Sequence, residues 1–300
     1  MTKKAIKKIA IVITAILAAA GVTVGIGGRL GNQNYSGNGT TDKDVSKTLE
    51  IHYMDVGQGD ATLIMCDDMT MLIDAGDNSQ GMNIRAYLEQ QGIEKLDYVI
   101  GTHPDADHIG GLDVVIYNFQ CDTILMPNEK KDTRTYEDVI QTIKDKNYKI
   151  TEPVVGTKYE LGEAEFTIIA PNDDYSDANN ESIGLLLTHG DNTFLFTGDA
   201  EHEAEADILA NGIDIKADVY KAGHHGSRTA SGEEFLEAVK PEIVVVSCGE
   251  DNSYGHPHAD ILVYCMENKI PMYRTDMQGT IVATSDGDEI VWNMSPYDGY

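Results

Sequence analysis

Positive charge is scarce in this sequence. Its 300 residues include 22 lysines and arginines against 50 aspartates and glutamates, so the formal net charge is −28 at pH 7. This balance excludes a globally basic surface of the kind that attracts nucleic acid through its phosphates. A phosphate-bearing substrate would need bound cations or a local basic patch.

Cysteine is scarce as well. None of the four cysteines belongs to a Cys-x-x-Cys clip, which removes the usual sign of a structural zinc site. Each lies in or beside an apolar run, which favours free buried thiols, although an oxidising compartment would allow three complete pairings. The four are Cys66, Cys121, Cys248 and Cys265.

The composition is that of a folded protein. Hydrophobic residues make up 41% of the chain and charged residues 24%, which excludes a disordered polymer. No shorter internal repeat is visible. We therefore expect one large core.

The first 28 residues have the pattern of an export segment. Lysines at positions 3, 4, 7 and 8 precede an apolar run that reaches Ile26, which is typical of a cleaved signal peptide or an N-terminal membrane anchor. Residues 29–48 are rich in Asn, Gly, Ser and Thr and read as a flexible linker. We expect residues 49–300 to form the folded domain, either secreted or anchored to the outer face of the cytoplasmic membrane.

Alternating and helical patterns follow one another twice along this domain. Strand-like runs open each half, and strand-helix alternation follows them, which indicates an α+β fold with two mixed sheets face to face and helices outside. The expected strands are 49–54, 61–66, 70–74, 98–100, 123–126, 148–150, 166–170, 184–188, 193–197, 218–221, 243–247, 280–284 and 289–292, and the expected helices are 83–91, 135–146, 201–211, 232–239 and 259–268.

The densest group of reactive side chains is Thr102-His-Pro-Asp-Ala-Asp-His-Ile-Gly-Gly. It places His103, Asp105, Asp107 and His108 just after a predicted strand, and open sheets keep their ligand sites at the carboxyl ends of strands. Two such close carboxylates do not both stay ionised cheaply without a compensating cation. The stretch therefore predicts a metal site.

Three later stretches carry reactive groups after apolar runs. They hold Asp199, the pair His224 and His225, and the pair His256 and His258. Glycines beside these residues allow sharp turns that could bring the groups to a common centre.

Together these motifs resemble the metallo-beta-lactamase superfamily and, within it, the beta-lactamase-like domain of the ComEC competence proteins. The resemblance covers residues 49–294. It implies a four-layer αββα sandwich with a two-metal hydrolytic site. The matching stretches are Asp55-Val-Gly-Gln-Gly-Asp-Ala, Leu72-Ile-Asp-Ala-Gly, the His103 stretch, Asn180 with Ser182, Thr197-Gly-Asp, His224-His-Gly-Ser and Tyr254-Gly-His-Pro-His.

Two departures from the superfamily pattern matter. Asp105 stands where His-x-His-x-Asp-His has its second histidine, a change that competence-type relatives share. The histidine expected between that motif and the bridging aspartate has no counterpart near Asn180 and Ser182, and His189 in a predicted hairpin is a poor substitute.

The resemblance implies a set of metal ligands. His103 and Asp105 would hold one divalent ion, Asp107 and His108 the other, and Asp199 would bridge them. His224 would complete the second site, with His225 as the competing choice. Exchange of imidazole for carboxylate makes the ligand set harder, which favours manganese over zinc.

In this interpretation a hydroxide held between two metal ions attacks a phosphodiester. Asp107 would orient it, and His256 or His258 would contact a phosphate oxygen or protonate the leaving alkoxide. Lys221, Ser227 and Arg228 would contact the anionic substrate. Loop-bracing residues behind the metals would be Asp55, Asp60, Asp74, Asn180 and Ser182, whereas His52 and His202 are expected at the surface.

The sequence thus predicts an exported metal-dependent phosphodiesterase, acting on DNA or a nucleotide-like compound, with contact to a membrane only through its N-terminal segment. Hydrolysis of a lactam, lactone or ester is an alternative that the same fold supports. A non-catalytic, metal-stabilised surface binding module is the third. The sequence does not indicate an oligomeric state.

Overall fold

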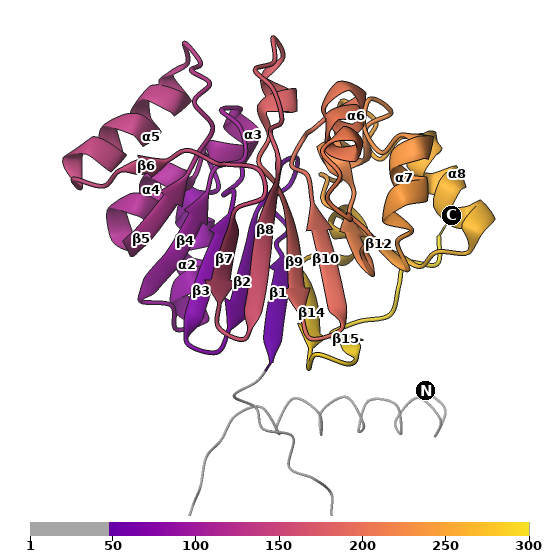
Figure 1. The fold of residues 1–300 in the computed structure, drawn as a ribbon. Coiled ribbons are helices and arrows are strands. Elements are labelled where there is room, and N and C mark those ends of the chain that lie inside the picture. The colour runs from indigo at the N-terminus through magenta and orange to yellow at the C-terminus, as the bar shows by residue number, and fades with distance from the viewer. Residues whose placement is uncertain (1–47, 300) are drawn as a thin grey trace, which may run out of the picture. The chain divides into compact units, whose positions relative to one another are not determined.

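The computed structural model describes residues 48–299, in which two sheets lie face to face and helices cover their outer faces (Figure 1). The predicted leader (1–28) and all but the last residue of the predicted linker (29–48) lie outside the described residues. In the part of the chain that is described, no helix is long and apolar enough to span a membrane.

The first sheet has eight strands within the described residues. Pairing is antiparallel from β15 to β3 and parallel from β3 to β6. Its spatial order is β15 (Ile290–Trp292), β14 (Ile281–Ser285), β1 (Leu49–Tyr53), β2 (Thr62–Cys66), β3 (Met69–Ile73), β4 (Lys95–Ile100), β5 (Gln120–Leu125) and β6 (Ile150–Thr151).

The second sheet has seven strands within the same residues. It is parallel from β13 to β10 and antiparallel from β10 to β7, so both sheets are mixed, as predicted. The order is β13 (Met272–Arg274), β12 (Ile243–Val246), β11 (Val219–Lys221), β10 (Asn192–Phe196), β9 (Gly184–His189), β8 (Ala164–Ala170) and β7 (Lys158–Leu161).

Helices from the two halves of the chain cover opposite faces (Figure 1). Those after β3, β4 and β5 pack on the first sheet, and α6, α7 and α8 pack on the second. The helices are α2 (Gly81–Gln90), α3 (Ala106–Ile109), α4 (Leu112–Asn118), α5 (Arg134–Asp145), α6 (His202–Ala210), α7 (Glu233–Val239), α8 (Ala259–Asn268) and α9 (Thr275–Gln278), with 3₁₀ turns η2 (Ala178–Glu181) and η3 (Gly223–Gly226).

Three apolar cores separate the layers. The middle core joins the inner faces of both sheets, including Ile51 and Phe194. An outer core packs α2, α4 and α5 on the first sheet, including Leu88 and Val139, and another packs α6, α7 and α8 on the second, including Phe235. This is the predicted four-layer αββα sandwich.

β1 shows how alternation assigns side chains to these layers. Leu49, Ile51 and Tyr53 point into the middle core, and His52 therefore points to the helical side, where its Nδ1 lies 2.7 Å from the Tyr87 hydroxyl of α2. His52 is 4% exposed. The expectation of a surface histidine was wrong because the outer face of this strand is covered by a helix.

The predicted strands and longer helices match the structure closely, but the four-residue helices α3 and α9 and two strands were not predicted. β7 and β13 were not predicted; both are short edge strands, and β7 carries two charged residues, which weakens any apolar signal. All four cysteines are buried and free, which confirms the prediction of free thiols.

Candidate metal centre

Parallel strands of both sheets end at the same edge of the molecule, and the reactive side chains follow those ends. His103 and His108 come after β4, Asp199 after β10, and His224 and His225 after β11. His108 Nε2 lies 3.3 Å from His225 Nε2, so stretches more than 100 positions apart in sequence meet here. The sandwich thus assembles the site from both sheets.

The two histidines of the first sheet lie beside each other, with ring centroids 4.1 Å apart. Asp74 orients His108, because its Oδ2 lies 2.8 Å from His108 Nδ1. The hydroxyl and amide of Thr102 donate to the same carboxylate at 2.7 and 2.8 Å. With Nδ1 engaged by Asp74, His108 presents Nε2 to the centre, so Asp74 has the bracing position that the sequence predicts.

Asp199 enters from the second sheet on a braced loop. Ser182 Oγ accepts a 3.0 Å hydrogen bond from the Asp199 amide and lies 3.3 Å from His103 Nδ1. Asn180 Oδ1 accepts from the Glu201 amide at 2.9 Å. Both Asn180 and Ser182 therefore brace the loop that carries Asp199.

His225, rather than His224, turns into the buried group. His225 Nδ1 lies 3.1 Å from the Ser247 carbonyl oxygen, and its Nε2 lies 3.4 Å from Asp199 Oδ2. His224 is partly exposed: its Nε2 lies 3.5 Å from Asp199 Oδ2, and its Nδ1 lies 3.2 Å from Glu201 Oε1. The structure thus favours the alternative that the sequence left open.

Four buried side chains each offer one ligand atom, and these atoms lie within 4.8 Å of one another: Asp60, His108, Asp199 and His225. Asp60 was predicted only to brace a loop. A Cβ on the neighbouring Gly59 would lie 2.4 Å from the Asp107 carbonyl oxygen, so this loop packs tightly against α3. The Gly-Gln-Gly-Asp pattern is the signal that could have indicated this close approach.

The buried atoms here that have no hydrogen-bond partner include three that could bind a metal: His103 Nε2, Asp60 Oδ1 and Asp199 Oδ1. An unsatisfied buried polar atom costs about 1–3 kcal/mol. A divalent cation would satisfy one imidazole nitrogen and two carboxylate oxygens together. The residues present therefore fit a bound metal.

Buried imidazoles and buried carboxylates face one another in this site and shift each other's pKa values. Burial lowers the pKa of His103 to about 3, and the neighbouring His108 adds to the effect, so His103 is a neutral, ligand-competent imidazole. Burial opposes the charged form of His108, but Asp199 and Asp74 outweigh it and raise its pKa well above 6.5. Asp199 and Asp60 likewise outweigh the effect of burial on His225 and raise its pKa.

The two aspartates of the first stretch face different ways. Asp107 Oδ2 lies 3.4 Å from His225 Nε2. Burial would raise the pKa of Asp107, yet His225 and His108 hold that pKa at about 2. Asp105 instead accepts a hydrogen bond from Lys131, a residue that sequence reasoning missed. The structure therefore brings Asp107 to the centre but not Asp105.

His256 and His258 lie on the loop after β12. Gln58 Nε2 lies 3.4 Å from His256 Nδ1, and burial, aided by His225, lowers the pKa of His256 to about 4. His258 Nδ1 accepts a 3.0 Å hydrogen bond from the Arg228 amide. His256 thus faces the centre, whereas His258 is engaged by the backbone beside it.

Of the three predicted substrate contacts, only Arg228 is exposed. Lys221 is 4% exposed and ion-paired with Asp60 beneath the site, which corrects its expected contact with substrate. Ser227 is buried and lies 2.9 Å from the Thr229 hydroxyl. Asp55 is exposed and accepts from the Gly57 amide at 3.2 Å, in keeping with a loop-bracing role.

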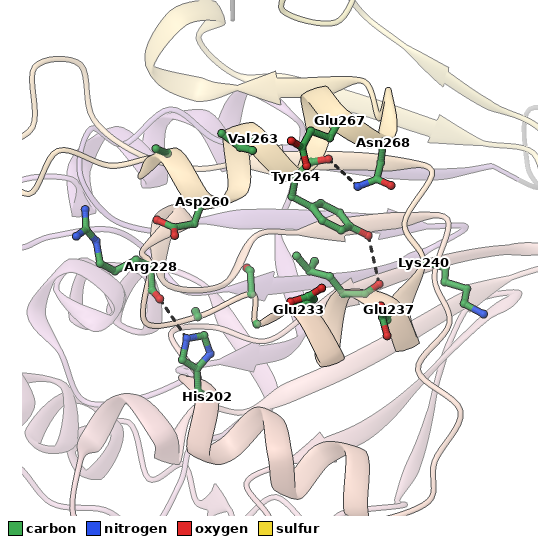
Figure 2. A pocket seen from close by; sticks show the side chains of 15 residues that line it. His202, Arg228, Glu233, Glu237, Lys240, Asp260, Val263, Tyr264, Glu267 and Asn268 are labelled. Carbon is green, nitrogen blue, oxygen red and sulfur yellow. Dashed lines mark hydrogen bonds between the residues drawn. The ribbon is translucent and has the colours of Figure 1, made fainter.

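An open groove of about 1020 Å³ runs between α7 and α8, and Figure 2 shows His202 and Arg228 at one end of it. Its lining includes four acidic side chains: Glu233, Glu237, Asp260 and Glu267. Such a lining disfavours a polyanion. An anionic substrate is therefore better placed at the metal centre than in this groove.

The sequence matches the family model described as Metallo-beta-lactamase superfamily over residues 54–250. ComE operon protein 3 of Bacillus subtilis is 31% identical, over 79% of this chain and 33% of its own length. Recombination protein 2 of Haemophilus influenzae is 30% identical, over 80% of this chain and 29% of its own length. Competence protein ComA of Neisseria gonorrhoeae is 27% identical, over 76% of this chain and 31% of its own length. The chain thus spans about a third of the length of these relatives.

Solved structures support the fold. The metallo-beta-lactamase fold protein YhfI from Bacillus subtilis superimposes with a TM-score of 0.52 at 12% identity, over 76% of this chain and 96% of that protein. A mutant of the beta-hydroxylase CmlA from Streptomyces venezuelae superimposes with a TM-score of 0.52 at 15% identity, over 79% of this chain and 53% of that protein. At these identities the likeness concerns the fold alone.

Proposed function

Since the chain belongs to the metallo-beta-lactamase superfamily, with ComEC-like competence proteins among its relatives, we propose that it is a metal-dependent phosphodiesterase acting on nucleic acid or a nucleotide-like compound. The observation that carries this proposal is the buried group of Asp60, His108, Asp199 and His225 beside the unpartnered Nε2 of His103. Asp107 lies at its exposed side.

The balance of ligands supports a phosphodiester rather than a lactam. Three carboxylates (Asp60, Asp107 and Asp199) surround the imidazoles, and oxygen-rich sets suit manganese or magnesium better than zinc. The relatives' names, which refer to competence and recombination, also support a nucleic-acid substrate. Two divalent ions, manganese or zinc, would polarise phosphoryl oxygens and lower the pKa of a water molecule.

We propose that His256 serves the leaving group. Gln58 Oε1 accepts from the Gly249 amide at 3.2 Å, which fixes its amide so that Nε2 donates to His256 Nδ1. The His256 proton then resides on Nε2, and its ring lies 6.1 Å from that of His225. In this role His256 donates a hydrogen bond to the leaving oxygen, while exposed Arg228 offers its guanidinium to a phosphate oxygen.

The decisive experiment is a substrate panel on the full chain. Metal-depleted protein is supplied with Mn²⁺ or Zn²⁺ and assayed on bis-p-nitrophenyl phosphate, linear DNA and nitrocefin. We expect phosphodiester turnover that falls at least ~100-fold in His103→Ala and Asp199→Ala, and the matched control His202→Ala should keep it. Turnover of nitrocefin alone would favour the lactam alternative, and metal binding without any turnover would favour a binding module.

We also propose that the domain acts outside the cytoplasmic membrane. Support comes from the basic and then apolar start of the sequence. Protease treatment of intact source cells, with a cytoplasmic protein as control, measures this directly. Protection of the domain until the cells are lysed would contradict it.

A further inference from the structure

Tyr254 is an aromatic side chain held at the surface beside the metal centre. It is 65% exposed, and its ring stacks on that of His256, with centroids 5.5 Å apart and an interplanar angle of 21°. Because the ring is mostly in water, burial in the core does not account for its position.

The stack continues inward. The His256 ring stacks on His225, with centroids 6.1 Å apart and planes 30° apart. His225 belongs to the buried group of candidate ligands. Three rings therefore connect the surface to the metal centre in one column: Tyr254, His256 and His225.

The loop that carries Tyr254 is braced on both sides. Asn252 Oδ1 accepts from the His256 amide at 2.9 Å, and its Nδ2 donates to the Gly249 and His256 carbonyl oxygens at 2.9 and 2.6 Å. Gln58, from the loop after β1, contacts both Gly249 and His256. A platform fixed before binding loses little entropy when a ligand stacks on it.

Charge argues for a base rather than a phosphate at this position. Glu250 and Asp251 are both exposed on the same loop and repel phosphate. An uncharged aromatic ring is attracted by stacking regardless of these carboxylates. A substrate that offers both a flat base and a phosphodiester meets both parts of the site.

We propose, on the basis of the phosphodiesterase function above, that Tyr254 is the stacking platform for one base of a nucleotide or single-stranded nucleic-acid substrate, which places the adjoining phosphodiester at the metal centre. Stacking of a base on an aromatic side chain strengthens binding of the substrate by about 5- to 150-fold. It tolerates any base. Tyr254 is thus a specificity-determining residue for base-bearing substrates.

The test compares a single-stranded oligonucleotide with an abasic oligomer of the same length and backbone. With Mn²⁺-loaded full chain, we expect kcat/KM on the base-bearing strand to fall about 5- to 150-fold in Tyr254→Ala and to stay within about twofold on the abasic strand. Tyr254→Phe should retain the preference. The control Tyr117→Ala, at a tyrosine that is 67% exposed on α4, should behave as wild type.

An equal loss of kcat/KM on both strands would overturn the proposal, because it would indicate a structural role for Tyr254. No loss of kcat/KM on either strand would overturn it as well. Binding of the two labelled strands, followed by fluorescence anisotropy, gives a second readout. If wild type hydrolyses no phosphodiester but binds the base-bearing strand more tightly in a Tyr254-dependent way, the phosphodiesterase function fails and the platform stands. If the protein hydrolyses both strands equally well, the phosphodiesterase function stands and the platform at Tyr254 fails.

Discussion

Lys221 and Asp60 form a buried ion pair directly beneath the metal centre. Their side chains are 5% and 4% exposed, and removal of one partner from such a pair leaves an uncompensated charge in the interior. We expect Lys221→Met to lower the free energy of unfolding by about 3–5 kcal/mol, measured by urea titration. Arg134→Ala breaks an exposed pair with Asp138 and should cost about 0.5 kcal/mol or less. Equal losses would contradict this.

His52 makes the stability of the domain depend on pH. Burial lowers its pKa below 6.5, despite the opposing carboxylate of Glu50. As pH falls below 6.5, the unfolded chain binds a proton that folded His52 does not, so its contribution to stability declines as the solution becomes more acidic. We expect His52→Gln to flatten this part of the stability curve, measured by urea titration between pH 7 and 5. An unchanged slope would contradict it.

Sequence reasoning reached those site residues whose place depends only on where a strand ends. His103 and Asp199 lie within three residues of a strand end, His108 lies on the short helix α3 that follows β4, and the structure brings the three together. The choice between His224 and His225 depends on backbone rotation: both have left-handed φ values, 48° and 55°. Neighbouring residues of one type give no signal for which ring turns inward.

Charged residues were harder to place, because their partners are distant in sequence. Lys221 was expected to meet substrate, but every residue of β11 is buried, and Asp60 neutralises the lysine from the opposite sheet. Asp105 was expected to bind metal, but it meets Lys131 from the loop before α5. Neither pairing leaves a pattern in the local sequence.

At the scale of elements, Gly110 allows α3 to lie against the loop after β3. A Cβ there would lie 2.3 Å from the Asn78 amide nitrogen and 2.4 Å from the Ala106 carbonyl oxygen. We expect Gly110→Ala to cost about 1–3 kcal/mol of stability and to weaken Mn²⁺ binding, because α3 carries His108. The measurements are urea unfolding and metal titration by calorimetry.

Gly92→Ala is the matched control for that change. Gly92 has a φ of +77°, and a Cβ there would meet no atom within 4 Å. Its cost is therefore confined to the backbone, about 1–2 kcal/mol, and Mn²⁺ affinity should stay as in wild type. Equal metal affinities in the two variants would show that the packing of α3 does not position the site.

Hydrophobic periodicity predicted the central strands and most helices because both outer faces of the sandwich are covered. Each core strand then carries a continuous or alternating apolar pattern, as in Leu49–Tyr53 and Ile243–Val246. The edge strand Lys158–Leu161 depends on pairing with Ala164–Ala170 rather than on its own composition. Such strands become visible only once the sheet is assembled.

For the whole molecule, a metal bound at the centre would connect the two sheets. Its candidate ligands come from loops of both sheets, with His108 on the first and His225 on the second. Binding to the folded state alone at 100 times Kd adds about 2.7 kcal/mol of stability. We expect Mn²⁺ to raise Tm by about 5–10 °C, measured by differential scanning fluorimetry. The rise should vanish in Asp199→Asn and persist in Asp55→Asn; an equal rise in both would place the ion elsewhere.

The pairing of β1 with β14 constrains how the chain acquires its structure during synthesis. Leu49 lies opposite Ser285, so the first strand gains its second neighbour only after β14 (Ile281–Ser285) has left the ribosome. Until then β1 has one unpaired edge. The first sheet of a nascent chain therefore stays incomplete until β14 has been synthesised, and that interval is when holdase chaperones would have their longest access to it.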